Sequence, residues 1–301
     1  MRRYTVYQVD SFTETKFRGN PAGVVLNADG LTEDDMHNIA RELNNSETAF
    51  LFSSEEKDCD GELRYFTPKV EVPTCGHATI AALFVKAHEN KLNDCILNIK
   101  TKVGILPMEI IRRPSGYYIS MTQGTFEIVG SLTDEEQTEL INALGIKEDD
   151  LEKRCPVQIV STGHSKVMIG LKSRDTMNGI IPDNEKLKQL SVKIRCNGYF
   201  VFTFDTDKPG ILTEGRMFAP AIGINEDPVT GNANGPFGGY LIANGIANPE
   251  GNVFRFTGYQ GEAINRPGKI DVEILCKNGK PEKVKIGGKA VIVFRTEIDI
   301  E

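Results

Sequence analysis

Proton transfer near neutral pH needs titratable side chains in sheltered places, and the sequence offers a first candidate at Glu47. This residue is flanked by Ser46 and Thr48 just ahead of the apolar run Ala49-Phe-Leu-Phe52, where a helical pattern breaks and a strand pattern begins. A carboxylate beside an apolar wall loses hydration, which raises its pKa toward the range in which it can accept and return a proton. Glu47 is therefore a candidate general acid/base, against the alternative of an ordinary solvated loop glutamate.

Two more titratable side chains, Cys75 and His77, flank Gly76, where another helical pattern starts. The positive end of a helix macrodipole stabilises a thiolate and favours the neutral form of an imidazole. Both side chains could assist a proton transfer; the alternatives are an inert buried thiol and a structural histidine. Asp227, just before Pro228, could orient His77 or a substrate group, or only cap the following turn.

The sequence around Gly76 recurs in the second half of the chain. Pro73-Thr-Cys-Gly-His-Ala78 is matched by Pro228-Val-Thr-Gly-Asn-Ala233, and Leu63-Arg-Tyr-Phe-Thr-Pro68 faces Gly215-Arg-Met-Phe-Ala-Pro220, three residues out of step. Each copy predicts a strand, a turn and a helix that begins at a glycine. Two such helix starts facing each other would hold an anionic small molecule through their N–H groups. The alternative is that both glycines only serve turn geometry.

The element pattern also repeats, but the two halves differ at a titratable position. Strand 48–52 is answered by strand 199–204, and in that register Glu47 faces Asn197. Thr32 and Asp35 predict a capping box at the start of a helix. Further helices are expected from Gly76, over 131–145, over 184–190 and after 226–234, where Pro236 indicates a kink or a late start. Residues 17–23 are expected to form a turn, and the remaining strands to cover 4–10, 24–26, 63–67, 95–101, 105–111, 117–121, 157–160, 167–171, 216–218, 253–257, 270–275 and 284–295.

These elements predict an α+β fold of two pseudo-symmetric domains, each a curled mixed sheet wrapped around a central helix. The N-terminal domain is expected over residues 1–125 and the C-terminal domain over 126–290. A last strand near 290–301 could join the N-terminal domain. A chain of 301 residues is long enough for two such cores.

Composition excludes several classes of function. The net charge is −7, without a concentrated basic surface, so we expect no nucleic-acid partner. No signal-peptide pattern and no apolar run of membrane-spanning length occur, so we expect no membrane partner and a cytoplasmic protein. Six widely spaced cysteines form no CxxC pair and suggest neither a zinc site nor a disulfide framework. Nucleotide-binding glycine motifs are missing, so dinucleotide and triphosphate binding have no support, and HExxH and GxSxG are missing as well.

Five motifs together resemble one known family. They are Phe17-Arg-Gly-Asn-Pro-Ala-Gly-Val-Val25, Ser46-Glu-Thr-Ala-Phe50, Phe66-Thr-Pro68 with Glu71, Cys75-Gly-His-Ala-Thr79 and Glu226-Asp-Pro-Val-Thr-Gly-Asn-Ala233. Their order and content resemble the phenazine-biosynthesis PhzF-like family of the diaminopimelate-epimerase-like superfamily, over essentially the whole chain. The resemblance implies two domains with an active site between them, cofactor-independent isomerisation by proton transfer at carbon, and a homodimer.

The resemblance also assigns roles. It implies that Glu47 is the general acid/base, with His77 and Asp227 as assisting residues. Substrate binding falls to the helix starts and their neighbours: Asn20, Cys75, Gly76, Thr230, Gly231 and Asn232. Asn232 stands where the phenazine enzyme has serine, which leaves the substrate open. Cys75 matches the first cysteine of the epimerases, but Thr230 replaces their second.

We therefore expect an isomerase that moves a proton at carbon on a small carboxylate-bearing metabolite, with Glu47 removing and redelivering the proton on one face. Two alternatives stay open. The cleft could serve a non-catalytic protein as a ligand-binding or protein-binding module, or the protein could be an epimerase that depends on Cys75.

Overall fold

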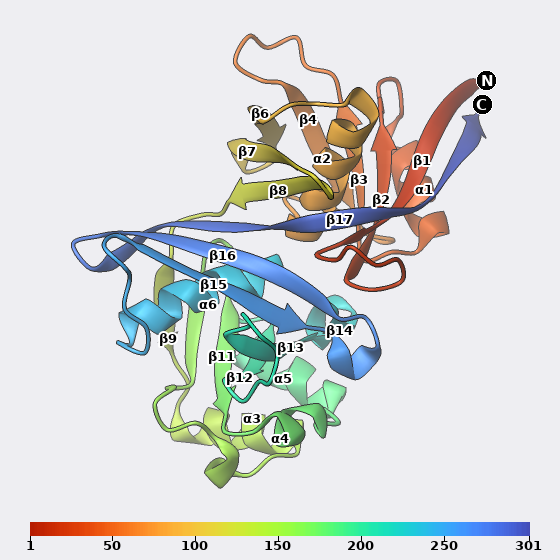
Figure 1. Ribbon diagram of the computed structural model, residues 1–301. Coiled ribbons are helices and arrows are strands. Elements are labelled where there is room, and N and C mark those ends of the chain that lie inside the picture. The colour runs from red at the N-terminus through yellow and green to blue at the C-terminus, as the bar shows by residue number, and fades with distance from the viewer. The chain divides into compact units, whose positions relative to one another are not determined.

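The computed structural model describes residues 1–301, which form two compact units. Unit 1 holds residues 1–122 and 287–301, and unit 2 holds residues 123–286 (Figure 1). The boundary expected from the sequence was residue 125, against residue 122 here. That the two units are copies of one ancestral domain stays a prediction.

The strands of unit 1 close into a ring. Neighbouring strands follow the order β1, β2, β3, β4, β6, β7 and β8. The pairs β2–β3 and β4–β6 are parallel, and the other pairs in this order are antiparallel. Strand β17 pairs with both β1 and β8 and so joins the two ends of this order. The strands are β1 (Arg2–Ser11), β2 (Asn20–Leu26), β3 (Thr48–Phe52), β4 (Gly61–Phe66), β5 (Glu71–Val72), β6 (Cys95–Thr101), β7 (Gly104–Arg113), β8 (Gly116–Thr122) and β17 (Lys280–Ile300).

Helix α2 (Gly76–Asn90) fills this ring. It packs against β1, β2, β3, β7 and β8, as Figure 1 shows, and eleven of its fifteen residues are buried. A helix that is apolar nearly all round is expected in such a place. Helix α1 (Glu33–Leu43) lies against β3 and β4 with only one face buried, and Thr32 and Asp35 form the predicted capping box at its start. The prediction of a helix within a barrel-like sheet is confirmed for this unit.

Unit 2 repeats the same order of strand pairs. Here β10–β11 is antiparallel, β11–β12 parallel, β12–β13 antiparallel, β13–β15 parallel and β15–β16 antiparallel, with β9 added beside β10. Its strands are β9 (Glu127–Ser131), β10 (Gln158–Ser161), β11 (Lys166–Leu171), β12 (Tyr199–Thr203), β13 (Thr213–Ala219), β14 (Ile224–Asp227), β15 (Val253–Gln260) and β16 (Gly268–Lys277), and the first residues of β17 belong to it. Its α-helices are α3 (Asp134–Leu144), α4 (Arg174–Asn178), α5 (Asn184–Ile194) and α6 (Gly231–Ala243), and its 3₁₀ turns are η1 (Glu148–Asp150), η2 (Pro220–Ile222) and η3 (Glu262–Ile264).

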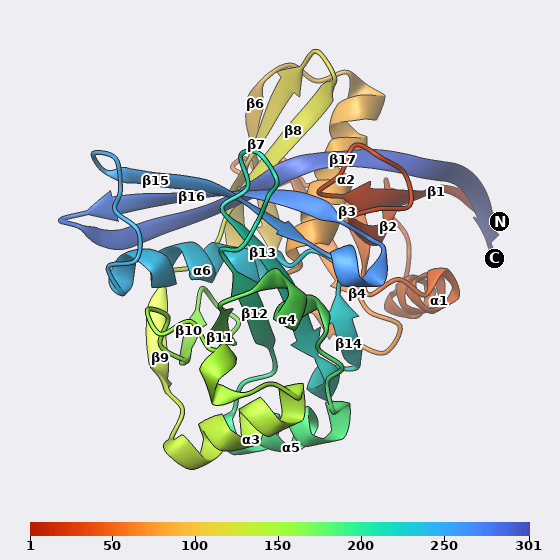
Figure 2. The same cartoon turned by 60° about the horizontal axis from the view of Figure 1, so that its bottom comes forward.

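Helix α6 is the counterpart of α2. It contacts β9 and β10 at one end of the strand order and β15 and β16 at the other, so the sheet bends around it. The rings of Phe202, Phe237 and Tyr240 pack together in this core. Pro236 lies inside the helix, which begins at Gly231, so the expectation of a late start is wrong. On the other side of the sheet, α3 and α5 pack against each other (Figure 2).

An arginine–glutamate pair closes the turn before each central helix. Arg64 donates from Nε and Nη2 to Glu71 at 2.9 and 2.8 Å, and Arg216 donates to Glu226 in the same two-pronged way at 3.0 and 2.7 Å. The segments 67–70 and 220–223 that join the paired strands are equally long. The three-residue offset between the two sequence copies therefore lies within the strands, where the pairing of β13 with β14 has a register shift between Met217 and Ala219. Both copies reach the same ion pair despite this shift.

The local sequence pattern did not predict elements that depend on pairing with distant residues. Strand β2 begins at Asn20, inside the Gly/Pro segment 17–23 that we expected to be a turn, because residues 20–23 pair with β1. The short elements β5, β9, β14 and α4 were not expected either. They are two to five residues long, too short to show a period of their own.

The two arginines give a matched stability test. Arg216 is the more buried, with 7 % of its side chain exposed against 24 % for Arg64, and it also donates to the carbonyls of Met177 and Ile180. Arg216→Ala leaves Glu226 as a buried, uncompensated charge, so we expect a loss of about 3–5 kcal/mol in unfolding free energy. Arg64→Ala should cost about 1–3 kcal/mol, since Lys102 stays 2.5 Å from Glu71. Urea unfolding measures both, and equal losses would contradict this account.

Candidate active site

Glu47 is held where α1 ends and β3 begins. Asn44 caps α1 in the left-handed conformation, with φ of 50°, and β3 starts at Thr48. The backbone N–H of Gly23 in β2 donates to the Glu47 carbonyl at 3.3 Å. A Cβ at position 23 would lie 2.6 Å from both Leu43 Cδ1 and Thr48 Oγ1, so only glycine lets the strand approach this closely. The backbone that carries Glu47 is therefore fixed from both sides.

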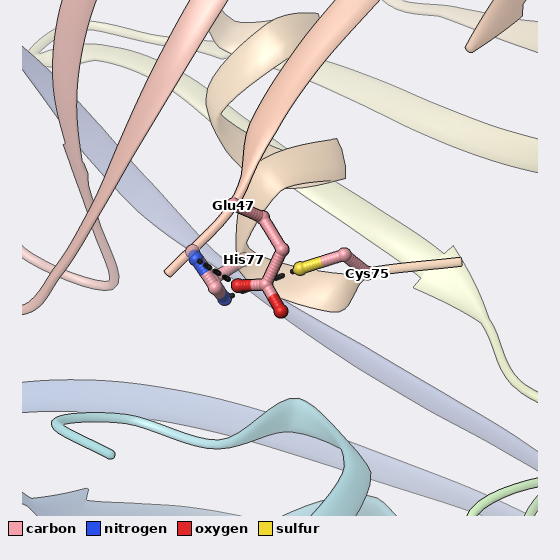
Figure 3. A group of neighbouring side chains, drawn as sticks. All are labelled: Glu47, Cys75 and His77. Atoms are coloured by element: carbon pink, nitrogen blue, oxygen red, sulfur yellow. Dashed lines mark hydrogen bonds and ion pairs between the residues drawn. The ribbon is translucent and has the colours of Figure 1, made fainter. Parts of the chain in front are cut away.

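The structure brings Glu47, Cys75 and His77 together (Figure 3). Glu47 Oε2 lies 3.4 Å from His77 Nε2, and Cys75 Sγ lies 3.4 Å from His77 Nδ1. A tautomer with its proton on Nε2 donates to the carboxylate and accepts from the thiol at Nδ1. The imidazole thus links the carboxyl and the thiol.

This cluster is shielded from solvent. The side chains of Glu47 and His77 are 14 % and 8 % exposed, and Cys75 is buried. Burial raises the pKa of the Glu47 carboxyl above its ordinary value, and hydrogen bonds from Ser46 and Cys75 oppose part of that rise. Desolvation is the largest cause of the shift, so the protonated carboxyl is favoured here more than in a solvated glutamate.

The backbone around His77 is tied to neighbouring elements. Ser11 Oγ at the end of β1 donates to the His77 carbonyl at 2.8 Å, and Ser46 Oγ lies 3.3 Å from His77 Nε2. Asn20 is fully buried at the start of β2, opposite Ser11. Asn20 therefore lies one strand away from the residue that holds His77. Sequence reasoning did not find Ser11, because its contact joins residues 66 positions apart.

The helix starts at Gly76 and Gly231 differ from those of the other α-helices. In α1, α3, α4 and α5 a side chain of the N-cap residue accepts a hydrogen bond from the first turn. Helices α2 and α6 begin after Cys75 and Thr230 without such a bond and without an acidic residue in the first turn. The two helix starts at which the sequence repeat predicts anion binding are thus the two that have no side-chain cap. This arrangement suits a negatively charged ligand.

The remaining candidates surround the start of α6 in unit 2. Asp227 ends β14 and accepts a hydrogen bond from the Thr230 hydroxyl. Gly231 and Asn232 open the helix, and Gln123 Nε2 donates to the Gly231 carbonyl at 3.0 Å and lies 3.3 Å from Asn232 Oδ1. Unit 1 therefore holds Glu47, Cys75 and His77 as one cluster, and unit 2 holds Asp227, Thr230, Gly231 and Asn232 within one turn and helix start.

Sequence reasoning also missed a buried glutamine in unit 2. Gln260 Nε2 donates to the Asp227 carbonyl at 2.8 Å, and Gln260 Oε1 accepts from the Thr230 N–H at 3.2 Å. Gln260 lies at the end of β15, about thirty residues from both partners, and no local pattern marks it. It fixes the turn that carries Asp227.

Comparison with known proteins gives a consistent result. The family model described as "Phenazine biosynthesis-like protein" matches residues 9–296. An "Uncharacterized isomerase" of Clostridium acetobutylicum is 53 % identical over 298 residues, covering 99 % of both chains. The "Uncharacterized isomerase YddE" of Escherichia coli strain K12 is 48 % identical over 296 residues, covering 98 % of both.

Solved structures agree with these sequence relatives. The phenazine biosynthesis protein of the PhzF family from Bacillus anthracis superposes with a TM-score of 0.90 at 31 % identity, covering 100 % of both chains. A hydroxyproline epimerase from Agrobacterium vitis superposes with a TM-score of 0.64 at 13 % identity, covering 99 % of this chain and 92 % of that one, which shows a shared epimerase-like fold alone. No helix has both the length and the apolar character to span a bilayer. The chain belongs to the phenazine biosynthesis-like family and is an isomerase.

Proposed function

We propose that this isomerase works without a cofactor and moves a proton between carbons of a small carboxylate-bearing metabolite, with Glu47 as the single general acid/base. The observation that carries the proposal is the burial of Glu47 against His77, with its pKa raised chiefly by that burial. A desolvated carboxyl can take a proton from carbon and still give it back at the same pH. Glu42 is an exposed neighbour with no such environment.

The reaction needs charge stabilisation as well as a base. Removing a proton from a carbon beside a carboxylate or a conjugated system leaves negative charge on the substrate. The start of α2 carries the positive end of the helix dipole at Gly76 and His77, next to Glu47. Glu47 then returns the proton to another carbon on the same face. No redox change and no second base are required.

The other residues that the family resemblance implies enter the proposal with their expected roles. His77 and Asp227 assist the transfer, and Asn20, Cys75, Gly76, Thr230, Gly231 and Asn232 bind the substrate. In support, the start of α6 shares with the start of α2 the lack of a side-chain cap. A homodimer in the cytoplasm also stays a prediction.

One contact favours a second candidate, an epimerase in which Cys75 supplies a base. Its sulfur lies 3.4 Å from His77 Nδ1, the arrangement that activates a thiol in other proteins. The chain offers Thr230 at the corresponding place in unit 2, and a threonine hydroxyl is a much weaker acid than a thiol. An inversion of stereochemistry that uses two thiols would therefore find only one thiol in this chain's two matching positions. The mechanism with Glu47 as the single base is the better supported.

Glu47→Gln tests the leading proposal. In deuterium oxide, with a panel of small carboxylic acids as probes, the protein should replace a carbon-bound hydrogen by deuterium, followed by proton NMR. Glu47→Gln should lower this exchange by about 10²–10⁴-fold, the usual worth of general acid–base catalysis. Glu42→Gln, a matched change at an exposed position, should leave it intact. A folded Glu47→Gln protein that exchanges at the original rate would end the proposal.

Cys75→Ser separates the two candidate functions. With Glu47 as the only base, this variant should lose far less exchange than Glu47→Gln and should not change the stereochemistry of the product. With Cys75 as a base, the exchange should collapse in both variants, and a pure stereoisomer should racemise only in the unaltered protein. Chiral chromatography of the recovered substrate measures the outcome. Loss of deuterium exchange in Cys75→Ser, together with racemisation by the unaltered protein, would favour the epimerase.

The raised pKa of Glu47 also predicts a pH-dependent stability. The folded state holds the carboxyl proton above pH 4.5, the ordinary pKa, where the unfolded chain releases it. Between the two pKa values the folded state binds more protons, so stability falls as pH rises through the folded pKa. Glu47→Gln carries no such charge and should melt above the unaltered protein at neutral pH, with the difference vanishing below about pH 4.5. Thermal melting at several pH values would reveal a constant difference if this account were wrong.

A further inference from the structure

The Glu47, Cys75 and His77 cluster has the composition of a metal site. Its carboxylate, thiol and imidazole each offer one ligand atom, and these atoms all lie within 4.8 Å of one another. Thiolate, imidazole and carboxylate are the three ligand types that Zn²⁺ takes in proteins, whereas Mg²⁺ and Ca²⁺ prefer oxygen ligands alone. The chemistry of the set therefore selects a soft divalent cation.

The distance between two of the ligand atoms already fits a tetrahedral ion. Bond lengths of about 2.3 Å to sulfur and about 2.0–2.2 Å to nitrogen or oxygen place neighbouring ligand atoms about 3.3–3.6 Å apart. Cys75 Sγ and His77 Nδ1 are already 3.4 Å apart. Glu47 Oε2 now lies beside the other ring nitrogen, Nε2, at 3.4 Å. A rotation of the glutamate side chain toward the thiol side of the ring would complete three ligands around one ion.

Two of the three ligands stand on a rigid part of the fold. Cys75 and His77 lie at the start of α2, where Thr79 Oγ1 donates to the Cys75 carbonyl at 2.6 Å and Ser11 Oγ to the His77 carbonyl at 2.8 Å. Both are more than nine-tenths buried. Preorganised, desolvated ligands lose little freedom on binding an ion, and three protein ligands leave a fourth position for water.

We propose that Glu47, Cys75 and His77 bind one Zn²⁺ ion and that this ion reversibly inhibits the isomerase. The bound ion takes the carboxylate lone pair that would otherwise accept the substrate proton, and it also occupies the imidazole beside it. Binding releases the protons of the ligands, as metal binding to thiol and imidazole does. The inhibition rests on the proposed function, whereas the binding of the ion does not.

Metal titration tests the binding step without any substrate. Chelator-treated protein should take up one Zn²⁺ per chain in calorimetry, and Co²⁺ in its place should give the absorption band of a cobalt–thiolate bond. Cys75→Ser should weaken Zn²⁺ binding by more than the about 10–100-fold typical of losing an outer contact, and should remove the band. Cys95→Ser, a half-buried cysteine in β6 of the same unit, is the matched control and should change neither. Unchanged binding in Cys75→Ser, or no thiolate band, would overturn the proposal.

A second measurement does not depend on the folding of a variant. In the unaltered protein, saturating Zn²⁺ should slow alkylation of Cys75 by iodoacetamide at least tenfold, as followed by mass spectrometry of the peptide. An unchanged rate at Cys75 would also overturn the proposal.

The inhibition is tested by deuterium exchange. The rate should fall in proportion to Zn²⁺ occupancy and return after chelation. Full occupancy with undiminished exchange would overturn the inhibitory role. The proposed function is tested separately, by whether deuterium exchange in chelator-treated protein depends on Glu47. A failure of the inhibitory role can therefore be told from a failure of the proposed function.

Discussion

The forked ion pair between an arginine and a glutamate is the constraint on which both helix starts depend. Arg64 and Arg216 each bind both oxygens of a carboxylate on the next short strand, Glu71 or Glu226. A bidentate pair fixes direction as well as distance. Each pair locks the strand just before a central helix, so the helix can begin at a defined point without a side-chain cap. The absence of a capping side chain leaves the N–H groups of each helix start open to the anionic ligand that we propose.

In unit 1 this constraint decides the environment of the proposed catalytic base. The turn that this ion pair fixes places Cys75 and His77 at the start of α2. The segment between α1 and β3 places Glu47 beside them. The carboxyl is thereby desolvated, which costs stability in its charged form and is opposed only in part by Ser46 and Cys75. Natural proteins accept such local costs at functional sites. The same enclosure also holds the three groups of the proposed metal site.

Much of this could be predicted from the sequence, and the parts that could not share a cause. Capping residues, apolar periods and glycines at helix starts are local signals, so the box at Thr32 and the helix from Gly76 were found. The repeated Arg and Glu were visible in the sequence, but their pairing across a three-residue offset depends on a register shift between β13 and β14. Ser11 and Gln260 act through contacts 66 and about 30 residues distant, and strand β2 exists because β1 pairs with it. Such contacts follow from topology, which a single sequence does not reveal.

The comparison of the two units supports the proposal of a single catalytic base. Their strand pairs follow the same order. Thr48 in β3 pairs with Phe66, and Tyr199 in β12 pairs with Phe218. The position that matches Glu47 is therefore Gly198, not the expected Asn197, and it has no side chain that could titrate. At the start of α6, Gln260, Asn234 and Asp227 bind the backbone and hydroxyl of Thr230. At the start of α2, the corresponding space holds a thiol, an imidazole and a carboxyl with raised pKa. The positions in unit 2 that match Glu47 and Cys75 therefore carry no comparable base, which favours the proposed single-base mechanism.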